Sequence, residues 1–474
     1  MARALTLTQL KNKNDVTRTE IMRMVWNMSI PAILSQITFI AMQYIDAAMV
    51  GSLGAQASAS VGLVSSASWL LFGITMASTV GFSILVGQRL GAGELDKARS
   101  LMHQSFIVNV IVAVAVVFFG LMISNSVPLW MGGNESIAGD SASYFMILVF
   151  SIPFFLMRVL SSSLVQATGN MKIPSAVSAA TCLLDIFWNF FFIFPSRTYD
   201  LSFMELYVPG FGFGVPGAAL GTVVAECITS VTIVYYLLRK SELKLVTGEK
   251  WKFCAADVIN ALKLGIPVGI ENGVMTAAMV ATTRIIAPLG NVALAANIFA
   301  IEAEGLCYMP GYGIASAISP IISQCIGAKR YDLVKRCSKY GIILGAMVMG
   351  LCGIVMYFIC PAIFMIFTPD HAVRELGVKI LRIEMLAEPM FGVSIVAAAV
   401  LRGAGDTLIP SILNAISIWG IRISLCLILV PTYGLTGAWI AMCIELCCRG
   451  TLLLIRYLYS PWKKTGTENR SLTK

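Results

Sequence analysis

The sequence predicts an all-α integral membrane protein whose twelve transmembrane helices form two six-helix bundles. Three observations predict this fold. The 474 residues are 57% hydrophobic and only 12% charged, whereas about a quarter of the residues of soluble domains are charged. Apolar runs of about 20 residues, the length that spans a bilayer as a helix, recur along the chain. The second half of the sequence also repeats the first at a constant offset.

Twelve apolar runs are the predicted spans. Their centres lie near residues 38, 70, 112, 152, 185, 226, 275, 308, 348, 390, 420 and 446. The predicted units are an N-terminal tail (1–24), a first bundle (25–238), a linker (239–262), a second bundle (263–458) and a C-terminal tail (459–474). The linker is expected to end in an amphipathic helix on the membrane surface, which carries Trp251, Phe253, Val258 and Leu262.

Two pairs of loop segments show the repeat. "GQRLGAGELDKARS" returns as "SQCIGAKRYDLVKR", and "GNMKIPS" as "GDTLIPS", each 236 positions later. Because each half has an even number of spans, the halves should be related by a pseudo-two-fold axis along the membrane normal, with a cleft between them. The offset falls to 220 between "VPGAAL" and "LTGAWI", so the first half has 16 extra residues, which we place around "RTYDLSFMELYVPGFG".

The formal net charge of +9 reflects topology. Lys and Arg gather in the N-terminal tail and in the loops after spans 2, 6, 8 and 12, whereas the loops between them carry few. Positively charged loops stay in the cytoplasm. The protein is therefore predicted to cross the cell (inner or plasma) membrane many times, with both termini in the cytoplasm. The expected partners are the bilayer and small solutes rather than nucleic acid, and the protein is expected to act as a monomer.

Cysteine and histidine offer no catalytic or metal pattern. The 12 Cys are scattered through apolar spans without metal-type spacing, and there are only 2 His. Neither an HExxH motif nor a nucleophile–base pair is present. The sequence therefore predicts a protein that is not an enzyme and that needs no cofactor beyond a coupling ion, Na⁺ or H⁺.

Two aspartates of the first half interrupt apolar spans. Asp46 lies in "YIDAAMVG" and Asp185 in "LLDIFWNFFFIF". Ionisable groups at membrane depth are costly and are treated as functional by default. Two carboxylates brought together bind a proton or form an oxygen site for a bare cation, which Thr181, Asn189 and Thr222 could complete. The alternative is a buried, hydrogen-bonded acid that holds helices together.

The second half has acids of its own. Glu271 and Glu388 are predicted to bind substrate or a proton, and the alternative is an ion pair with Arg422 or Arg284. Glu302 and Glu304 are two residues apart and cannot share a helix face. Whether these two and Glu445 are functional or belong to structural ion pairs stays open at this point.

Several motifs together resemble one family. In order they are "YIDAAMVG", "GQRLGA", "LLDIFWNFFFIF", "PGAALGT", "MPGYGIASAISPIISQCIGA" and "LRGAGDT". Their order and spacing are similar to those of the multidrug and toxic compound extrusion (MATE) transporters, over about residues 20–458. The resemblance implies a V-shaped transporter that exports cationic, amphipathic molecules in exchange for Na⁺ or H⁺.

The resemblance also bears on the site residues. Asp46, Asp185 and Thr222 match cation-site positions of the DinF-like branch, where an Asn stands at the position of Thr181. Other branches carry acids in spans 7 and 10, but these would fall about one turn beyond Glu271 and Glu388.

The sequence thus predicts a Na⁺- or H⁺-coupled antiporter that exports organic cations by alternating access. One alternative is a lipid-linked saccharide or lipid flippase of the same superfamily, which should line its cleft with basic residues. A second alternative, an intramembrane enzyme, lacks the constellation that its chemistry would need.

Overall fold

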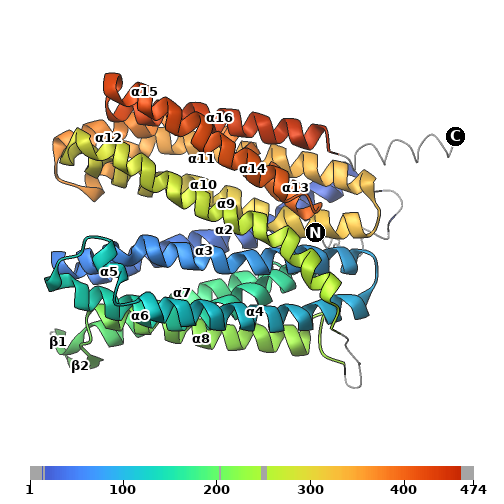
Figure 1. The fold of residues 1–474 in the computed structure, drawn as a ribbon, viewed down its shortest axis with the longest axis horizontal. Coiled ribbons are helices and arrows are strands. Elements are labelled where there is room, and N and C mark those ends of the chain that lie inside the picture. The colour runs from blue at the N-terminus through green and yellow to red at the C-terminus, as the bar shows by residue number, and fades with distance from the viewer. Residues whose placement is uncertain (1–12, 14–15, 202–203, 247–252, 461–474) are drawn as a thin grey trace.

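The computed structural model describes residues 13, 16–201, 204–246 and 253–460. The helices form two bundles, one above the other in Figure 1. The first contains α2 (Arg18–Gly51), α3 (Ala55–Gly91), α4 (Leu95–Ile123), α5 (Val127–Trp130), α6 (Glu135–Ala167), α7 (Lys172–Ile193) and α8 (Val215–Lys240). The second contains α9 (Ala255–Ile286), η1 (Ala287–Leu289), α10 (Asn291–Gly327), α11 (Tyr331–Phe367), α12 (His371–Glu384), α13 (Glu388–Gly403), α14 (Leu408–Ile416), η2 (Ser417–Ile423), α15 (Ser424–Tyr433) and α16 (Leu435–Leu458).

The helices account for the predicted spans. Among the described residues, 11 helices or continuous helical segments are long and apolar enough to cross a membrane, and α12 and α13 form one further pair bent by 56°. Counted as one broken span, this pair completes the predicted twelve. Pro389 follows the break, in the first turn of α13, where proline is tolerated because its missing N–H would have no helical partner.

The backbone repeats as the sequence does. Gly54 and Gly290 have φ angles of 116° and 96°, and Gly169 and Gly405 have 90° and 93°. Each pair is 236 residues apart, and positive φ is a conformation that glycine adopts without the steric cost of a Cβ. The turns that join equivalent helices therefore have the same geometry in both halves, which confirms the internal repeat.

The extra residues of the first half form a hairpin. Strands β1 (Pro195–Leu201) and β2 (Met204–Phe211) pair antiparallel between α7 and α8. The equivalent helices α15 and α16 are joined by Gly434 alone. The aromatic ring of Phe192, on α7, lies 5.5 Å from that of Phe211 and 6.4 Å from that of Phe213. The hairpin thus packs on the end of α7, at the predicted place, although the sequence did not indicate strands there.

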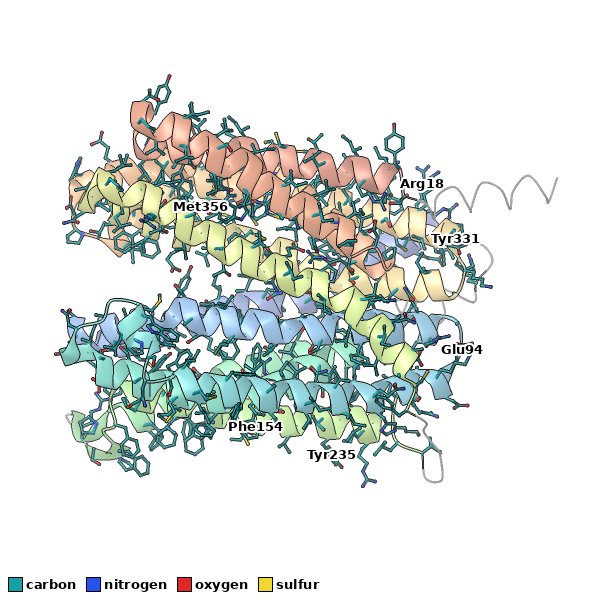
Figure 2. The ribbon with its side chains drawn as sticks, viewed as in Figure 1. Arg18, Glu94, Phe154, Tyr235, Tyr331 and Met356 are labelled. Carbon is teal, nitrogen blue, oxygen red and sulfur yellow. The ribbon has the colours of Figure 1, made fainter. Side chains whose placement is uncertain are left out.

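The first helix of each bundle begins in the core of the other bundle. Ile21, Met24 and Met28 of α2 belong to a buried cluster with α10, α11, α13 and α16. Ala261 of α9 belongs to a buried cluster with α3, α4, α6 and α8. Both crossings lie at the end of the molecule that holds the start of α2 and the end of α16, which we call the terminal end. In Figure 2, Arg18, Glu94 and Tyr331 all lie there.

The predicted surface helix of the linker is therefore wrong. Helix α9 runs without interruption from Ala255 into the span, and Val258 and Leu262 pack against the core of the first bundle. Phe253 precedes the helix and is exposed, and Trp251 lies outside the described residues. The amphipathic pattern arose from packing between bundles rather than from contact with a membrane surface.

The two bundles meet tightly at the terminal end. A Cβ added to Gly91, the last residue of α3, would lie 2.1 Å from the backbone oxygen of Gln324. A Cβ added to Gly327, the last residue of α10, would lie 1.9 Å from that of Gln88. These two contacts are equivalent under the 236-residue repeat, and we call the four residues the terminal gate. Only glycine permits the helices to cross this closely.

Candidate functional site

Asn189 joins the two predicted aspartates of the first bundle. Its side-chain Nδ2 donates to Asp46 Oδ1 at 2.8 Å and to Asp185 Oδ2 at 3.0 Å. Asp185 and Asn189 are buried one turn apart on α7, and Asp46 reaches them from α2. Since both carboxyl groups contact the same nitrogen atom, they lie close enough to share one small ion. The predicted proximity of Asp46 and Asp185 is confirmed.

Two oxygen atoms at this site have no hydrogen-bond donor among the described residues: Asp185 Oδ1 and Asn189 Oδ1. A buried acceptor without a partner is costly, and a proton or a small cation placed between the carboxyl groups would remove that cost. Oxygen atoms are also the ligands that hard cations prefer. The donor set therefore fits either H⁺ or Na⁺.

The two predicted threonines differ in their relation to the carboxyl groups. The Thr181 hydroxyl donates to the Val177 carbonyl of its own helix at 2.9 Å, and no contact to either aspartate is found among the described residues. Thr222, on α8, lies near Asp185, and its hydroxyl donates to the Ala218 carbonyl at 3.3 Å. Thr222 thus lines the site, whereas Thr181 does not complete it.

Glu271 is held in a cluster of donors. Arg402 Nη2 lies 2.7 Å from both of its carboxylate oxygens, and Ser411 and Asn414 donate to them at 2.6 Å. We call these four residues the Glu271 cluster. The alternative reading of Glu271 as an ion-paired acid therefore fits the structure, but the partner is Arg402, in the last turn of α13, rather than Arg422 or Arg284. With its acceptors occupied, Glu271 has little capacity left for a drug or a proton.

The repeat explains where the Glu271 cluster sits. Glu271, Ser411 and Asn414 occupy the positions that Ser35, Ser175 and Ser178 occupy in the first half, 236 residues earlier. There the Ser35 hydroxyl donates to that of Ser178 at 2.8 Å. The same helix contact is therefore neutral in one bundle and ionic in the other.

Glu388 does not lie beside Glu271. It is fully buried at the start of α13, and neither of its carboxyl oxygens has a hydrogen-bond partner among the described residues. Arg402, which holds Glu271, lies 14 residues further along the same helix, or about 21 Å at 1.5 Å per residue. The two glutamates that were each predicted to bind substrate or a proton thus belong to different sites.

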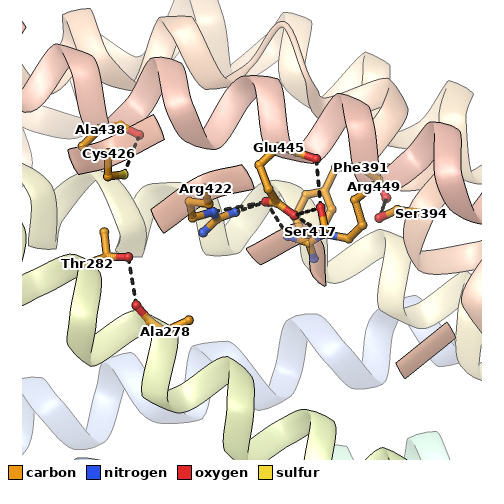
Figure 3. Close-up of polar contacts among 10 residues, drawn as sticks. All are labelled: Ala278, Thr282, Phe391, Ser394, Ser417, Arg422, Cys426, Ala438, Glu445 and Arg449. Carbon is orange, nitrogen blue, oxygen red and sulfur yellow. Dashed lines mark hydrogen bonds and ion pairs between the residues drawn. The ribbon is translucent and has the colours of Figure 1, made fainter. Parts of the chain in front are cut away.

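Glu445 lies between two arginines, as Figure 3 shows. Arg422 and Arg449 each approach it to 2.7 Å, and the Ser417 hydroxyl donates to it at 2.6 Å. Arg422 stands on the π-helical turn η2, which links α14 to α15. This group is a saturated ion cluster. Arg284, in contrast, is exposed and has no ion pair within the described part of the chain.

Glu302 and Glu304 face different directions, as their spacing predicted. Glu304 is buried, whereas Glu302 is exposed and its backbone carbonyl accepts a hydrogen bond from the Tyr44 hydroxyl at 2.6 Å. This bond joins α2 to α10, and hence the two bundles, two residues from Asp46.

Comparison with protein families gives one match that covers most of the chain. The MatE family model matches it twice, over residues 31–191 and 267–428. The two matches begin 236 residues apart, at the offset of the repeat, and together they cover more than half of the chain.

The chain belongs to the MATE family.

Relatives agree with this assignment over the whole length. A probable multidrug resistance protein NorM of Thermotoga maritima is 27% identical over 463 residues, which are 96% of each chain. The bent form of the Vibrio cholerae MATE transporter VcmN has a TM-score of 0.83 at 16% identity and covers 93% of this chain and 97% of its own. A MOP superfamily transporter from Pyrococcus furiosus has a TM-score of 0.86 at 18% identity, with 96% and 98% covered. The protein is therefore a membrane transporter of the MATE family, and MATE proteins are transporters rather than enzymes.

Sequence reasoning missed a further ion pair of this MATE protein. Arg158 on α6 binds Glu226 on α8 through two hydrogen bonds of 2.6 and 2.9 Å, and both residues are buried. The available signal was one basic and one acidic residue, each in an apolar run of the same half. Four arginines within the spans therefore neutralise three glutamates; they are Arg158, Arg402, Arg422 and Arg449.

The Glu271 cluster gives a stability prediction. We expect Glu271→Gln to lower the free energy of unfolding by about 3 kcal/mol, because it strands the positive charge of Arg402. Breaking a buried ion pair costs about 3–5 kcal/mol. We expect the lower value because a quarter of the Arg402 side chain is exposed to solvent. Thermal unfolding in detergent measures the change, and adding Arg402→Gln should restore part of the loss. Normal stability with lost transport would instead support the predicted role of Glu271 in binding drug or a proton.

Proposed function

We propose that this MATE protein is an antiporter that exports amphipathic organic cations by alternating access, driven by inward H⁺ or Na⁺ at Asp46 and Asp185. The observation that supports it is the amide of Asn189, which holds both carboxyl groups while two oxygen atoms beside them have no donor. One cation, or one proton, satisfies this arrangement. No other cofactor is needed.

Helix α2 supplies the coupling between ion and bundle movement. Its first turns pack in the core of the second bundle, whereas Asp46, near its other end, meets α7 of the first. Loading or emptying the site changes the force between α2 and α7. Because α2 is anchored in both bundles, that change is transmitted to their relative orientation, which is the basis of alternating access.

The charges within the spans favour cationic substrates. Four arginines within the spans, Arg158, Arg402, Arg422 and Arg449, are paired with glutamates. In contrast, Asp46, Asp185, Glu304, Glu384 and Glu388 have no basic partner within salt-bridge distance in the described chain. A flippase for anionic head groups should show the reverse balance. The Pyrococcus furiosus transporter of similar fold is described as having a binding pocket of reverse polarity, which suggests a different function for it. The unpaired acids within the spans of the present chain argue against a pocket of basic character here.

We propose that the protein lies in the cell membrane and that its terminal end faces the cytoplasm. The loops and helix ends there carry Lys97, Lys244, Lys329, Arg330 and Lys335, whereas the described loops of the opposite end carry mainly Arg197 and Arg374. Positive loops are retained inside. With the terminal gate closed, the structure then corresponds to a state that is closed toward the cytoplasm. The protein is proposed to work as a monomer.

Ethidium accumulation tests the substrate class. Cells that overproduce the protein should retain less ethidium than cells with the empty vector, because a cation pump lowers the steady-state level inside. Purified protein in liposomes, with H⁺ and Na⁺ gradients imposed separately, then identifies the coupling ion. Equal ethidium retention at normal membrane levels of the protein would contradict the proposal, and flipping of an anionic lipid in the same liposomes would favour the flippase.

A further inference from the structure

A cavity of about 300 Å³ opens on the outer side of the first bundle, between α4 and α8. Both helices pack on α6. In Figure 2, Tyr235 of α8 lies on the side of this bundle that faces away from the second bundle. The cavity is open to the surface, because Ile107 and Leu245 in its lining are exposed. We call it the α4–α8 groove, and its lining residues are His103, Phe106, Ile107, Val234, Leu238 and Leu245.

The groove is apolar along the helices and has one polar end. Helix α4 begins, and α8 ends, at the terminal end of the molecule (Figure 1). His103 therefore marks the end of the groove that is nearest the membrane surface, and every other lining side chain is apolar. Toward the middle of the span the exposed surface stays apolar, and its residues, each between 50% and 63% exposed, are Val110, Ile111, Val114 and Val231. A long apolar chain that starts near His103 can thus continue along both helices within the hydrocarbon region.

The linker between the bundles borders the polar end of the groove. The backbone N–H of Leu245 donates to the Leu238 carbonyl at 2.9 Å, so the chain folds back over the last turn of α8. At the other end of the linker, the backbone N–H of Cys254 donates to Gln104 Oε1 at 3.2 Å. Gln104 is the neighbour of His103 in sequence. A molecule in the groove would therefore contact the linker as well as the two helices.

Basic side chains surround the polar end of the groove. They are Arg99, one turn before His103 on α4, and, on the last turn of α8 and the turn that follows it, Arg239, Lys240 and Lys244. The acidic neighbours are Asp96, which lies 3.5 Å from Arg99, and Glu242. Four positive charges are thus set against two negative ones, and the His103 imidazole can also donate a hydrogen bond. Basic side chains bind phosphate oxygens through charge-assisted hydrogen bonds, and basic pockets between spans at the cytoplasmic side suit anionic lipid head groups.

We propose that the α4–α8 groove binds one anionic phospholipid of the surrounding bilayer. Its phosphate lies at His103 and the basic side chains beside it, and one acyl chain lies along Phe106, Ile107 and Val234. A soluble anion would leave the apolar part of the groove unfilled, and an organic cation would meet the basic end. That this lipid belongs to the cytoplasmic leaflet rests on the orientation proposed above, whereas the binding itself does not.

Native mass spectrometry of the delipidated protein in detergent tests the site. The protein is titrated with dioleoylphosphatidylglycerol or dioleoylphosphatidylcholine, which have the same acyl chains. Wild-type protein should bind the first anionic lipid about tenfold more tightly than the first zwitterionic one. His103→Ala/Lys244→Ala should reduce this preference to about twofold or less, because it removes head-group contacts. Val234→Trp should weaken the binding of both lipids, because the larger side chain fills the groove.

Lys97→Ala is the matched control for charge. Lys97 lies at the same end of α4 but binds Glu94 at 2.8 Å on another face of the helix, so its loss should leave the preference unchanged. The anionic lipid should also raise the unfolding temperature of wild type and of this control, but not that of the double variant.

Three results would overturn the proposal. The first is equal affinity of wild-type protein for the two lipids. The second is the same loss of preference in Lys97→Ala as in the double variant, which would show diffuse attraction to a basic surface rather than a site. The third is displacement of the lipid by soluble glycerol phosphate, which would show that a phosphate suffices without the acyl chain. If Val234→Trp fails to fold, Ile107→Trp is used instead, because Ile107 is exposed.

Discussion

Asp46→Asn should abolish gradient-driven ethidium export and leave the amount of folded protein unchanged. The asparagine keeps an oxygen atom that can accept the bond from Asn189, so the contact between α2 and α7 survives. It removes the negative charge, so an H⁺ or Na⁺ gradient no longer changes the site, and coupled transport should fall to the background of empty liposomes. Ethidium binding by the purified variant should stay within about twofold of wild type.

Asp140→Asn is the matched control for this experiment. Asp140 is an exposed aspartate of the same bundle, on α6, and its replacement should leave transport intact. Full coupled transport by the Asp46 variant would show that the aspartate pair only holds helices together. Loss of folded protein would point to the same structural role.

Gly91→Ala should prevent closure at the terminal gate and reduce export at least tenfold. The added methyl carbon would lie 2.1 Å from a backbone oxygen of α10, closer than atoms in contact ever approach, and a backbone atom cannot be turned aside as a flexible side chain can. The helices must separate, and the conformation with this end closed loses stability relative to its alternative. A transporter that cannot close one end cannot complete its cycle.

The effect of Gly91→Ala on the terminal gate should be measurable as a longer distance between the two bundles at the terminal end. Spin labels introduced at exposed positions of the two bundles, by Asp96→Cys and Lys335→Cys with Cys254→Ser, report the separation of the terminal end. Gly91→Ala should shift the population toward longer distances. Gly62→Ala is the control, since a Cβ at Gly62, on the same helix α3, would meet no atom within 4 Å. Unchanged distances and transport in the Gly91 variant would exclude the gate.

The positions of Asp46, Asp185 and Asn189 could be anticipated because helix periodicity and the cost of buried charge act locally. Asn189 lies one turn from Asp185, so it had to share a face with it. The two-bundle architecture followed in the same way from the repeat and from the length of the apolar runs. These features depend on residues close in sequence or on a regularity of the whole chain.

The partners of the glutamates could not be anticipated, because they are decided by packing between helices far apart in sequence. Arg402 lies in "VLRG", at the end of an apolar run, and nothing in that segment indicated that it would bind Glu271. The crossing of α9 into the first bundle turned an apparent surface helix into a buried one. Glu384 was detectable, since it lies four residues before Glu388, but the break between α12 and α13 hid that relation.

Helices α3 and α10 each have 37 residues, which at 1.5 Å per residue makes them about 55 Å long. The hydrocarbon core of a bilayer is only about 30 Å thick, and tilt absorbs only part of the difference. Gly91 and Gly327 are the last residues of these helices, so we expect the place where they cross to lie among the lipid head groups rather than among the acyl chains. Separation of the helices there displaces phosphates and water, and the size and charge of the head groups, more than the length of the acyl tails, should set how easily this end of the transporter opens.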